Sequence, residues 1–173
     1  MEATLTAKQN QAQATSTDPR AGKYLIFHLS GEEFAIPVLD VREIIGIQAI
    51  TSVPQTPAYV RGVINLRGKV IPVIDLRMKF SLPELEYTQR TCIIVVNVRG
   101  NEGPLVMAIV VDGVAEVLNI AGGDIEDTPM FGDGTETKYL LGVAKIEGKV
   151  KILLDIHRVL TTQEMAGMGS LFQ

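Results

Sequence analysis

The sequence of this chain contains an internal repeat, which constrains the fold more than any other feature. Residues 61–76 (RGVINLRGKVIPVIDL) align with residues 141–156 (LGVAKIEGKVKILLDI), and the two segments share six identical positions. Upstream, residues 34–45 (FAIPVLDVREII) align with residues 107–118 (MAIVVDGVAEVL), and the runs YLIFHLSG and CIIVVNVRG occupy the corresponding places before them. Three similar segments in the same order are typical of a duplicated structural unit. The sequence therefore predicts two diverged copies of one unit.

The two copies span about residues 22–82 and 88–158, and each consists of short apolar runs separated by turn residues. Such runs predict strands rather than helices. The expected strands lie at residues 23–29, 33–37, 46–53, 62–66, 69–75, 91–99, 104–112, 114–119, 139–146 and 149–155. Five short strands with tight glycine turns bury both faces most economically as a small barrel, which leaves few free edges. We therefore expect an all-β fold of two five-stranded β-barrels packed side by side.

Both ends of the chain differ from this pattern. Residues 1–20 are rich in Ala, Gln and Thr and have no apolar periodicity, so we expect a disordered N-terminal tail before a domain at residues 21–160. Ile156, Val159 and Leu160 recur at helical spacing. Thr161 and Glu164 then have the spacing of a capping box, which predicts a short C-terminal helix or tail at residues 161–173.

The composition narrows the class of protein. With 16 Lys and Arg against 20 Asp and Glu, the net charge is −4, which argues against nucleic-acid binding because such binding needs basic surface. Cys92 is the only cysteine, which suits a reducing cytoplasm. The longest apolar run, residues 105–111, is far shorter than the roughly 18 residues of a membrane span, and the first twenty residues do not resemble a signal peptide. We expect a cytoplasmic protein with no direct membrane insertion.

No motif of catalysis or cofactor binding stands out. The sequence has no phosphate-binding glycine motif, no zinc motif and no cysteine pair. The acidic stretch at residues 124–136 lacks the ligand register of a calcium loop, so we expect a solvated loop there. Cys92 lies in an apolar strand and is expected to be a small buried hydrophobe, while His28 and His157 have no nucleophile motif beside them. We expect no enzyme activity, no cofactor and no metal.

The two copies carry charges of opposite sign. Residues 20–80 contain 8 basic and 5 acidic groups, a net charge of +3, whereas residues 81–173 contain 7 and 13, a net charge of −6. Arg67 at the tip of the first hairpin is matched by Glu147 in the second. Such polarity favours oriented association with other molecules, although solvated turn tips also tolerate either charge.

Two prolines interrupt strands of the first copy only. Pro37 and Pro72 stand where the second copy has Val110 and Ile152. Since proline cannot donate a hydrogen bond to a β-ladder, we expect both prolines at an edge or a bulge. Such positions either block unwanted pairing or border a docking surface.

These segments resemble the CheW family of bacterial chemotaxis coupling proteins. Residues 59–80 (YVRGVINLRGKVIPVIDLRMKF) carry the most recognisable similarity, supported by residues 34–44, 108–118 and 139–156. The similarity covers about residues 23–160. It implies a fold of two SH3-like five-stranded β-barrels. It also implies a non-enzymatic adaptor that joins the cytoplasmic tips of chemoreceptors to the regulatory domain of a CheA-type histidine kinase, and that is recruited to membrane receptor arrays through these partners.

The resemblance also implies which residues contact the partners. The matching positions are Val41 and Glu43, in DVREI, and Gly62, Asn65 and Arg67, in RGVINLRG. In the family, the arginine and the acid of these motifs are thought to pair near the receptor surface. We therefore expect Arg67 and Glu43 to approach one another.

Three alternatives stay open. The chain could serve a pilus-type or other chemosensory pathway in place of flagellar chemotaxis. It could be a detached regulatory module of a kinase, although 173 residues leave no room for a catalytic or receiver domain. It could also be an enzyme with an unrecognised site in the groove between the barrels.

Overall fold

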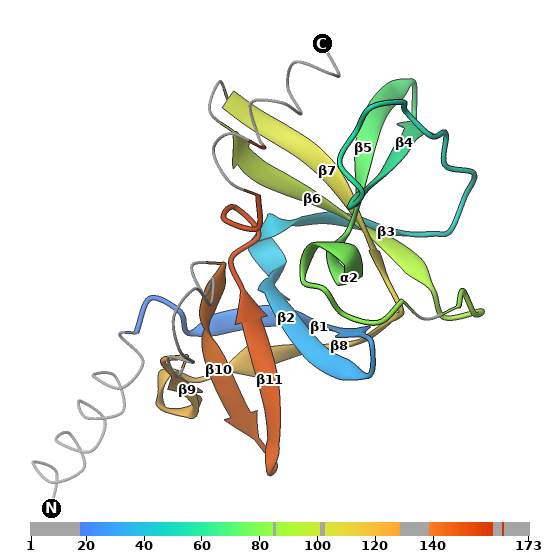
Figure 1. The fold of residues 1–173 in the computed structure, drawn as a ribbon. Coiled ribbons are helices and arrows are strands. Elements are labelled where there is room, and N and C mark those ends of the chain that lie inside the picture. Colours follow the sequence, from blue (N-terminus) through green and yellow to red (C-terminus); the bar gives the residue numbers. More distant parts are fainter. Residues whose placement is uncertain (1–17, 85, 101–102, 129–138, 161–163, 165–173) are drawn as a thin grey trace, which may run out of the picture.

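The strands of the protein form two β-sheets that lie side by side, as Figure 1 shows. The computed structural model describes residues 18–84, 86–100, 103–128, 139–160 and 164. Sheet A has the strand order β8-β1-β2-β11-β10-β9, and sheet B has the order β3-β6-β7-β5-β4. The strands of sheet A are β1 (Gly22–Leu29), β2 (Glu32–Pro37), β8 (Gly113–Ile120), β9 (Ile125–Glu126), β10 (Leu140–Ile146) and β11 (Lys149–Leu154). Those of sheet B are β3 (Val41–Gly46), β4 (Val60–Leu66), β5 (Lys69–Asp75), β6 (Cys92–Gly100) and β7 (Gly103–Val111). Between strands lie the 3-10 helices η1 (Val38–Asp40) and η2 (Gly122–Asp124) and the short helix α2 (Leu76–Lys79).

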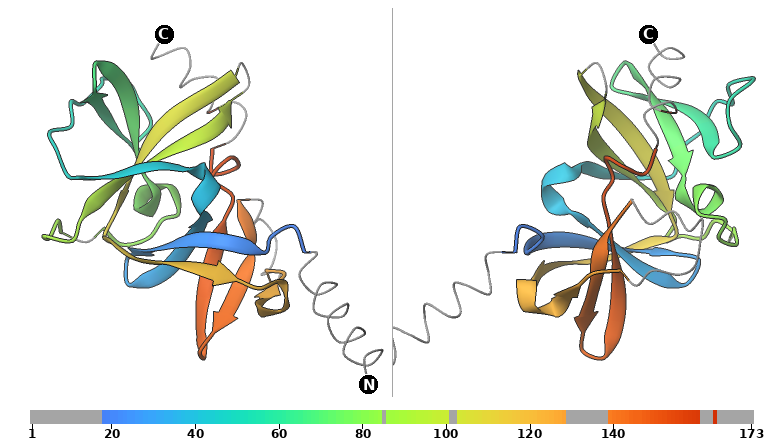
Figure 2. Two further views of the ribbon diagram at one scale, coloured as in Figure 1. Left: turned by 180° about the vertical axis from the view of Figure 1, so that it is seen from behind. Right: turned by 60° about the vertical axis from the view of Figure 1, so that its left-hand side comes forward.

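The two sheets do not follow the two sequence copies. The chain passes from sheet A to sheet B at η1 and returns between β7 and β8, so sheet B is the continuous stretch 41–111 and sheet A combines residues 22–37 with 113–154. Figure 2 shows β1 and β2 lying with β10 and β11 rather than with β4 and β5. The all-β fold of two SH3-like units is confirmed, but the assignment of one unit to residues 22–82 and the other to 88–158 is wrong.

Pairing between the copies explains this exchange. Strand β11 of the second copy runs parallel to β2 of the first, with Ile152 opposite Phe34. Strand β5 of the first copy likewise runs parallel to β7 of the second, with Val73 opposite Ala108. Each copy thus covers a strand edge of the other, which removes a template for pairing with foreign chains.

In each sheet, the segment that follows one edge strand crosses to the opposite edge and pairs there. After β3, Thr51 pairs with Val63 of β4, and the two residues exchange backbone hydrogen bonds of 2.9 and 2.8 Å. After β8, the two residues of β9 pair with β10, with Ile125 opposite Ala144. Equivalent places in the two copies therefore use equivalent contacts to bring the sheet edges together.

A glycine permits each of these edge contacts. A Cβ atom at Gly62 would lie 2.0 Å from the carbonyl oxygen of Thr51, and one at Gly142 would lie 2.6 Å from the carbonyl oxygen of Glu126. Both glycines also have positive φ angles, +142° and +150°, that side chains rarely adopt. Both follow a register shift at the start of a hairpin strand. This is the physical reason why glycine recurs in the repeat.

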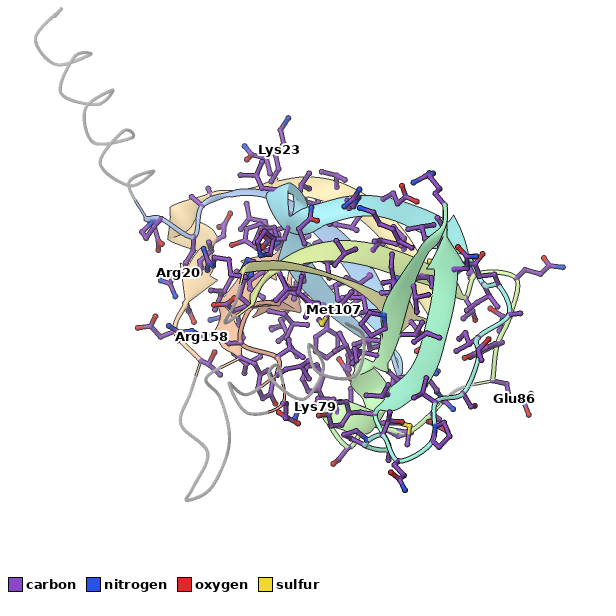
Figure 3. The ribbon with its side chains drawn as sticks, turned by 90° about the horizontal axis from the view of Figure 1, so that it is seen from above. Arg20, Lys23, Lys79, Glu86, Met107 and Arg158 are labelled. Atoms are coloured by element: carbon purple, nitrogen blue, oxygen red, sulfur yellow. The ribbon has the colours of Figure 1, made fainter. Side chains whose placement is uncertain are left out.

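The two sheets share one core, and each also encloses apolar residues of its own. On β6, Ile94 and Val96 pack in the core between the sheets, whereas Ile93 and Val95 pack inside sheet B. Met107 of β7 has no exposed surface and lies at the centre of the molecule in Figure 3. Because both faces of β6 and β7 are buried, their sequences are continuous apolar runs rather than alternating ones.

Some expected elements differ from those in the structure. The strand expected at residues 46–53 is wrong, because β3 occupies Val41–Gly46 and is set by its pairing with β6 rather than by the apolar run that follows it. Strand β9 and helix α2 were not expected, since elements of two and four residues carry no readable periodicity.

The expectation that Pro37 and Pro72 lie at an edge or a bulge is wrong, because β2 and β5 are interior strands of their sheets and have no register shift at either proline. Pro72 pairs with β4, but the ladder between β5 and β7 begins only at Val73, so the second side of Pro72 is unpaired. Pro37 is the last residue of β2 and lies beyond the pairing of β2 with β11. Both prolines stand in interior strands of their sheets, at points where those strands are paired on one side only.

The ends of the chain are described in part. The tail at residues 1–17, the acidic residues 129–136 and the expected C-terminal helix at 161–173, apart from Glu164, lie outside the described residues. Residues 156–160 form turns and bends rather than a helix, although their apolar side chains reach the core between the sheets. Arg20, expected in the tail, instead forms ion pairs with Asp18 and Asp127.

Candidate functional site

The tip of the hairpin between β4 and β5 presents an arginine on a strained turn. Arg67 and Gly68 have φ angles of 52° and 86°, the pair of positive values that a tight two-residue hairpin turn of type I′ requires. The side-chain oxygen of Asn65 accepts a hydrogen bond of 2.9 Å from the Gly68 N–H. Asn65 therefore stabilises the turn that projects Arg67.

Arg67 forms an ion pair with Glu43 of β3. Its Nη1 atom donates to Glu43 Oε2 at 2.7 Å, and this hydrogen bond raises the pKa of the Arg67 guanidinium. The arginine side chain is 72% exposed, whereas that of Glu43 is 22% exposed. The expected approach of Arg67 and Glu43 is confirmed, although β3 and β4 stand at opposite ends of the strand order of sheet B.

The other carboxylate oxygen of Glu43 is less well satisfied. Glu43 Oε1 is buried and has no hydrogen-bond partner among the described residues. A buried acceptor without a donor carries a desolvation cost that a partner's N–H or O–H group would relieve. The ion pair thus combines the exposed guanidinium of Arg67 with a carboxylate, that of Glu43, whose Oε1 atom can accept a further hydrogen bond.

The five residues singled out from the sequence do not all lie at this surface. The structure brings Glu43, Asn65 and Arg67 together at the hairpin tip. Val41 packs against the core between the sheets, on the far side of a register shift from Glu43. Gly62 is buried beneath Thr51. Val41 and Gly62 therefore have structural roles that the sequence motif did not distinguish from contact roles.

The equivalent hairpin of the second copy has the same shape and the opposite charge. Glu147 and Gly148 have φ angles of 53° and 78°, so the backbone turn is preserved. Lys145 replaces Asn65 in the repeat and forms an exposed ion pair with Glu126, at 3.2 Å. Among the described residues, no cation pairs with Glu147. The arginine–glutamate pair of the hairpin tip is therefore a feature of the first copy.

Several exposed apolar side chains were not predicted from the sequence. Leu39 of η1 is 94% exposed, and Ile44 of β3 and Val70 of β5 are also exposed. Leu39 lines a cavity of about 350 Å³ together with Arg20, at the end where β1 begins. Each of the three residues has one apolar and one charged sequence neighbour, so the local pattern does not separate these exposed positions from buried ones.

Among the residues with potential chemistry, His157 and Cys92 have structural contacts. His157 Nδ1 accepts a hydrogen bond of 3.0 Å from the Arg99 N–H, so the ring proton lies on Nε2, which is 3.1 Å from Asp40 Oδ1. Cys92 packs against the core between the sheets, and burial raises the pKa of its thiol. His28 lies half-buried on β1. In the described ranges, no group of three or more His, Cys, Asp or Glu residues could hold a metal ion.

Fold and site together define an all-β protein of two packed SH3-like units with a charged hairpin tip on one of them. No helix in the described part of the chain is long and apolar enough to span a bilayer. The family profile described as a CheW-like domain matches residues 23–164. The chain therefore belongs to the CheW family.

Individual relatives agree with this assignment. The chain is 40% identical over 144 residues to the chemotaxis protein CheW of Klebsiella aerogenes, covering 83% of this chain and 84% of that protein. It is 36% identical over 144 residues to the chemotaxis protein CheW of Rhizobium meliloti, covering 83% and 90%. The crystal structure of the scaffolding protein TtCheW from Thermoanaerobacter tengcongensis superposes with a TM-score of 0.74 at 33% identity, covering 84% of this chain and 97% of that one.

Proposed function

We propose that this chain is the coupling adaptor of a chemotaxis pathway, which joins a chemoreceptor to a histidine kinase without catalysing a reaction. The observation that carries this proposal is membership of the CheW family across residues 23–164, nearly the whole described chain. The partners are the cytoplasmic tip of a chemoreceptor and the regulatory domain of a CheA-type kinase. The adaptor acts in the cytoplasm and reaches the membrane through the receptor.

Coupling by such an adaptor is thermodynamic. An adaptor changes kinase activity in response to a receptor only if its contacts differ in strength between the two signalling states. A body with a single shared core suits this task, because a close-packed interior transmits a displacement rather than absorbing it. The core between the sheets contains side chains from both sheets, such as Phe27 of β1 and Ile94 of β6.

The receptor contact is best supported at the Arg67 hairpin. Glu43, Asn65 and Arg67 lie together there, and Glu43 Oε1 has capacity for a further donor. An exposed guanidinium offers several N–H groups in a planar fork, which recognises carboxylates and carbonyl groups on a helical partner. Val41 and Gly62 support this contact from behind, by holding β3 and the hairpin base in place.

Reversing the charge of Arg67 tests the contact. In Arg67→Glu, a second carboxylate would face Glu43, so we expect binding of a receptor tip fragment to weaken about tenfold or more. The melting temperature should change little, because glutamate already occupies the same left-handed turn position at residue 147. Binding to the kinase regulatory domain should be retained. Calorimetric titration with each partner, together with a thermal melt, measures all three quantities.

The matched control is Glu147→Arg, which reverses the charge at the equivalent tip of the second copy. This variant should leave receptor binding unchanged. A collapse of the melting temperature of Arg67→Glu with normal receptor affinity per folded molecule would make Arg67 a structural residue. Tighter binding to a kinase or receptor of a pilus-type pathway would move the protein to that pathway within the adaptor class.

A further inference from the structure

The chain passes between the sheets at two places, and an aspartate lies at each. Asp112 stands between β7 of sheet B and β8 of sheet A. Asp40 is the last residue of η1, between β2 of sheet A and β3 of sheet B. Any change in the angle between the sheets must bend the backbone at these two passages. Contacts that hold the two aspartates therefore restrain that angle.

Asp112 is held from both sheets. Its Oδ1 atom accepts a hydrogen bond of 2.9 Å from Arg77 Nη1, on the helix that follows β5 of sheet B. Its Oδ2 atom accepts one of 2.7 Å from the backbone N–H of Ser30, in the turn between β1 and β2 of sheet A. Its own N–H donates to the carbonyl oxygen of His28, at 2.9 Å. One carboxylate therefore links both sheets at the point of passage.

Arg77 is the centre of this arrangement. Its side chain has no exposed surface, and its Nε and Nη2 atoms donate to the two oxygens of Asp75, at 3.1 and 3.0 Å. Asp75 is also fully buried, and it accepts a further hydrogen bond from Arg61 of β4, at 3.0 Å. Buried charges in bidentate contact have few alternative geometries, because losing a partner leaves a charge uncompensated. We call these residues, with Ser30 and Asp112, the Arg77 cluster.

The Arg77 cluster reaches the base of the candidate site. Arg61 is the second residue of β4 and precedes Gly62, at the base of the hairpin whose tip is Arg67. A displacement of the hairpin tip by a partner therefore acts on Arg61 and Asp75 at its base, and through Arg77 on Asp112 and sheet A. The hydrogen bonds form a continuous path from sheet B to sheet A.

At the other passage between the sheets, Asp40 is held by a similar but more exposed set of contacts. His157 occupies the position of Arg77 in the repeat, and its ring contacts Asp40 at 3.1 Å while accepting the Arg99 N–H of β6. Asp155 accepts the His157 N–H, as Asp75 accepts the Arg77 N–H. The histidine contact is partly exposed, whereas Arg77 is enclosed. The Arg77 cluster is thus the stiffer of the two restraints.

We propose that Arg77 and Asp112 are positioning residues of the adaptor, which fix the angle between sheets A and B so that a displacement at the Arg67 hairpin reaches sheet A. This inference rests on the proposed coupling function. It predicts that weakening the cluster uncouples the two partners without abolishing the binding of either one.

Asp112→Asn tests the proposal with little change in shape. The amide cannot accept hydrogen bonds from both Arg77 and Ser30 with the strength of a carboxylate. Nitroxide labels at positions 70 and 150, both exposed and on different sheets, report the angle through their distance distribution in a Cys92→Ala background. We expect a broader or shifted distribution in Asp112→Asn. We also expect receptor-dependent kinase activation to fall by about fivefold or more at saturating partner concentrations, with each separate affinity retained.

Two further variants make the result decisive. Arg77→Lys keeps the charge but cannot bridge Asp75 and Asp112 with one planar group, and should act like Asp112→Asn. Glu126→Gln removes a carboxylate from the exposed pair with Lys145 and should change neither readout. An unchanged distance distribution in Asp112→Asn, or a changed distribution with normal activation, would overturn the proposal. If the unaltered protein bound neither partner, the coupling function would fail, while the label distances would still decide whether the cluster sets the angle.

Discussion

Dividing the chain after α2 should leave two fragments that do not fold alone but fold when mixed. Residues 1–85 contain β1 to β5, and residues 86–173 contain β6 to β11. The first fragment keeps the β1–β2 and β4–β5 hairpins but loses the partners of β3 and the parallel neighbours of β2 and β5. The second fragment keeps the β6–β7 and β10–β11 hairpins, with only the two residues of β9 beside β10. Isolated hairpins are marginally stable in water, so we expect neither fragment to keep a persistent sheet.

The cores lead to the same expectation. The core between the sheets combines Phe27 and Phe34 of the first fragment with Ile94 and Met107 of the second. Each fragment alone would expose its half of this apolar surface. Circular dichroism and thermal melts should show no cooperative transition for either fragment and a single transition for the equimolar mixture. A cooperative melt of either fragment by itself would mean that each sequence copy folds independently, contrary to the observed strand exchange.

Replacing Gly62 with alanine should destabilise the protein more than replacing any other glycine of the first hairpin. The added Cβ would lie 2.0 Å from the Thr51 carbonyl oxygen, where the chain after β3 pairs with β4, and the φ angle is +142°. Both the clash and the backbone strain fall on main-chain atoms, which cannot swing aside. We expect the free energy of unfolding to fall by about 3 kcal/mol or more, as measured by chemical denaturation.

Replacing two other glycines distinguishes the effect of the clash from that of the backbone strain on the free energy of unfolding. Gly68 has a positive φ angle but open space where a Cβ would lie, so Gly68→Ala should cost only about 1 kcal/mol. Gly123 has neither a positive φ angle nor a close neighbour, so Gly123→Ala should be nearly neutral. If Gly62→Ala were no worse than Gly68→Ala, the edge contact with Thr51 would not be a determinant of the fold. A Gly62→Ala protein that stayed fully stable and lost only receptor binding would restore Gly62 as a contact residue.

Much of the fold could be predicted from the repeat, but the exchange of strands could not. Alternating apolar residues and glycine turns identify strands such as β4 and β10 whichever strand lies beside them. The parallel pairings of β2 with β11 and of β5 with β7 involve only two and three residue pairs, and nothing in the sequence specifies those neighbours. Strand partners depend on long-range packing that local periodicity does not encode.

The candidate site was predictable in part. The pairing of Arg67 with Glu43 followed from the family resemblance, since 24 residues of sequence separate the two side chains. The charge reversal at Glu147 was readable from the repeat alone. The structural role of Gly62 and the burial of Arg77 were not, because both depend on atoms brought near from distant parts of the chain. A sequence motif identifies residues that occur together. It does not distinguish residues that contact a partner from residues that stabilise the fold.

A coupling adaptor must hold both partners at the same time. Calorimetric titration of the kinase regulatory domain into the protein saturated with a receptor tip fragment measures simultaneous binding, with the reverse titration as its check. We expect the second partner to bind still and a complex of all three molecules to form, with an affinity that depends on the first partner. Binding of one partner that displaces the other, or no binding of either, would contradict this expectation.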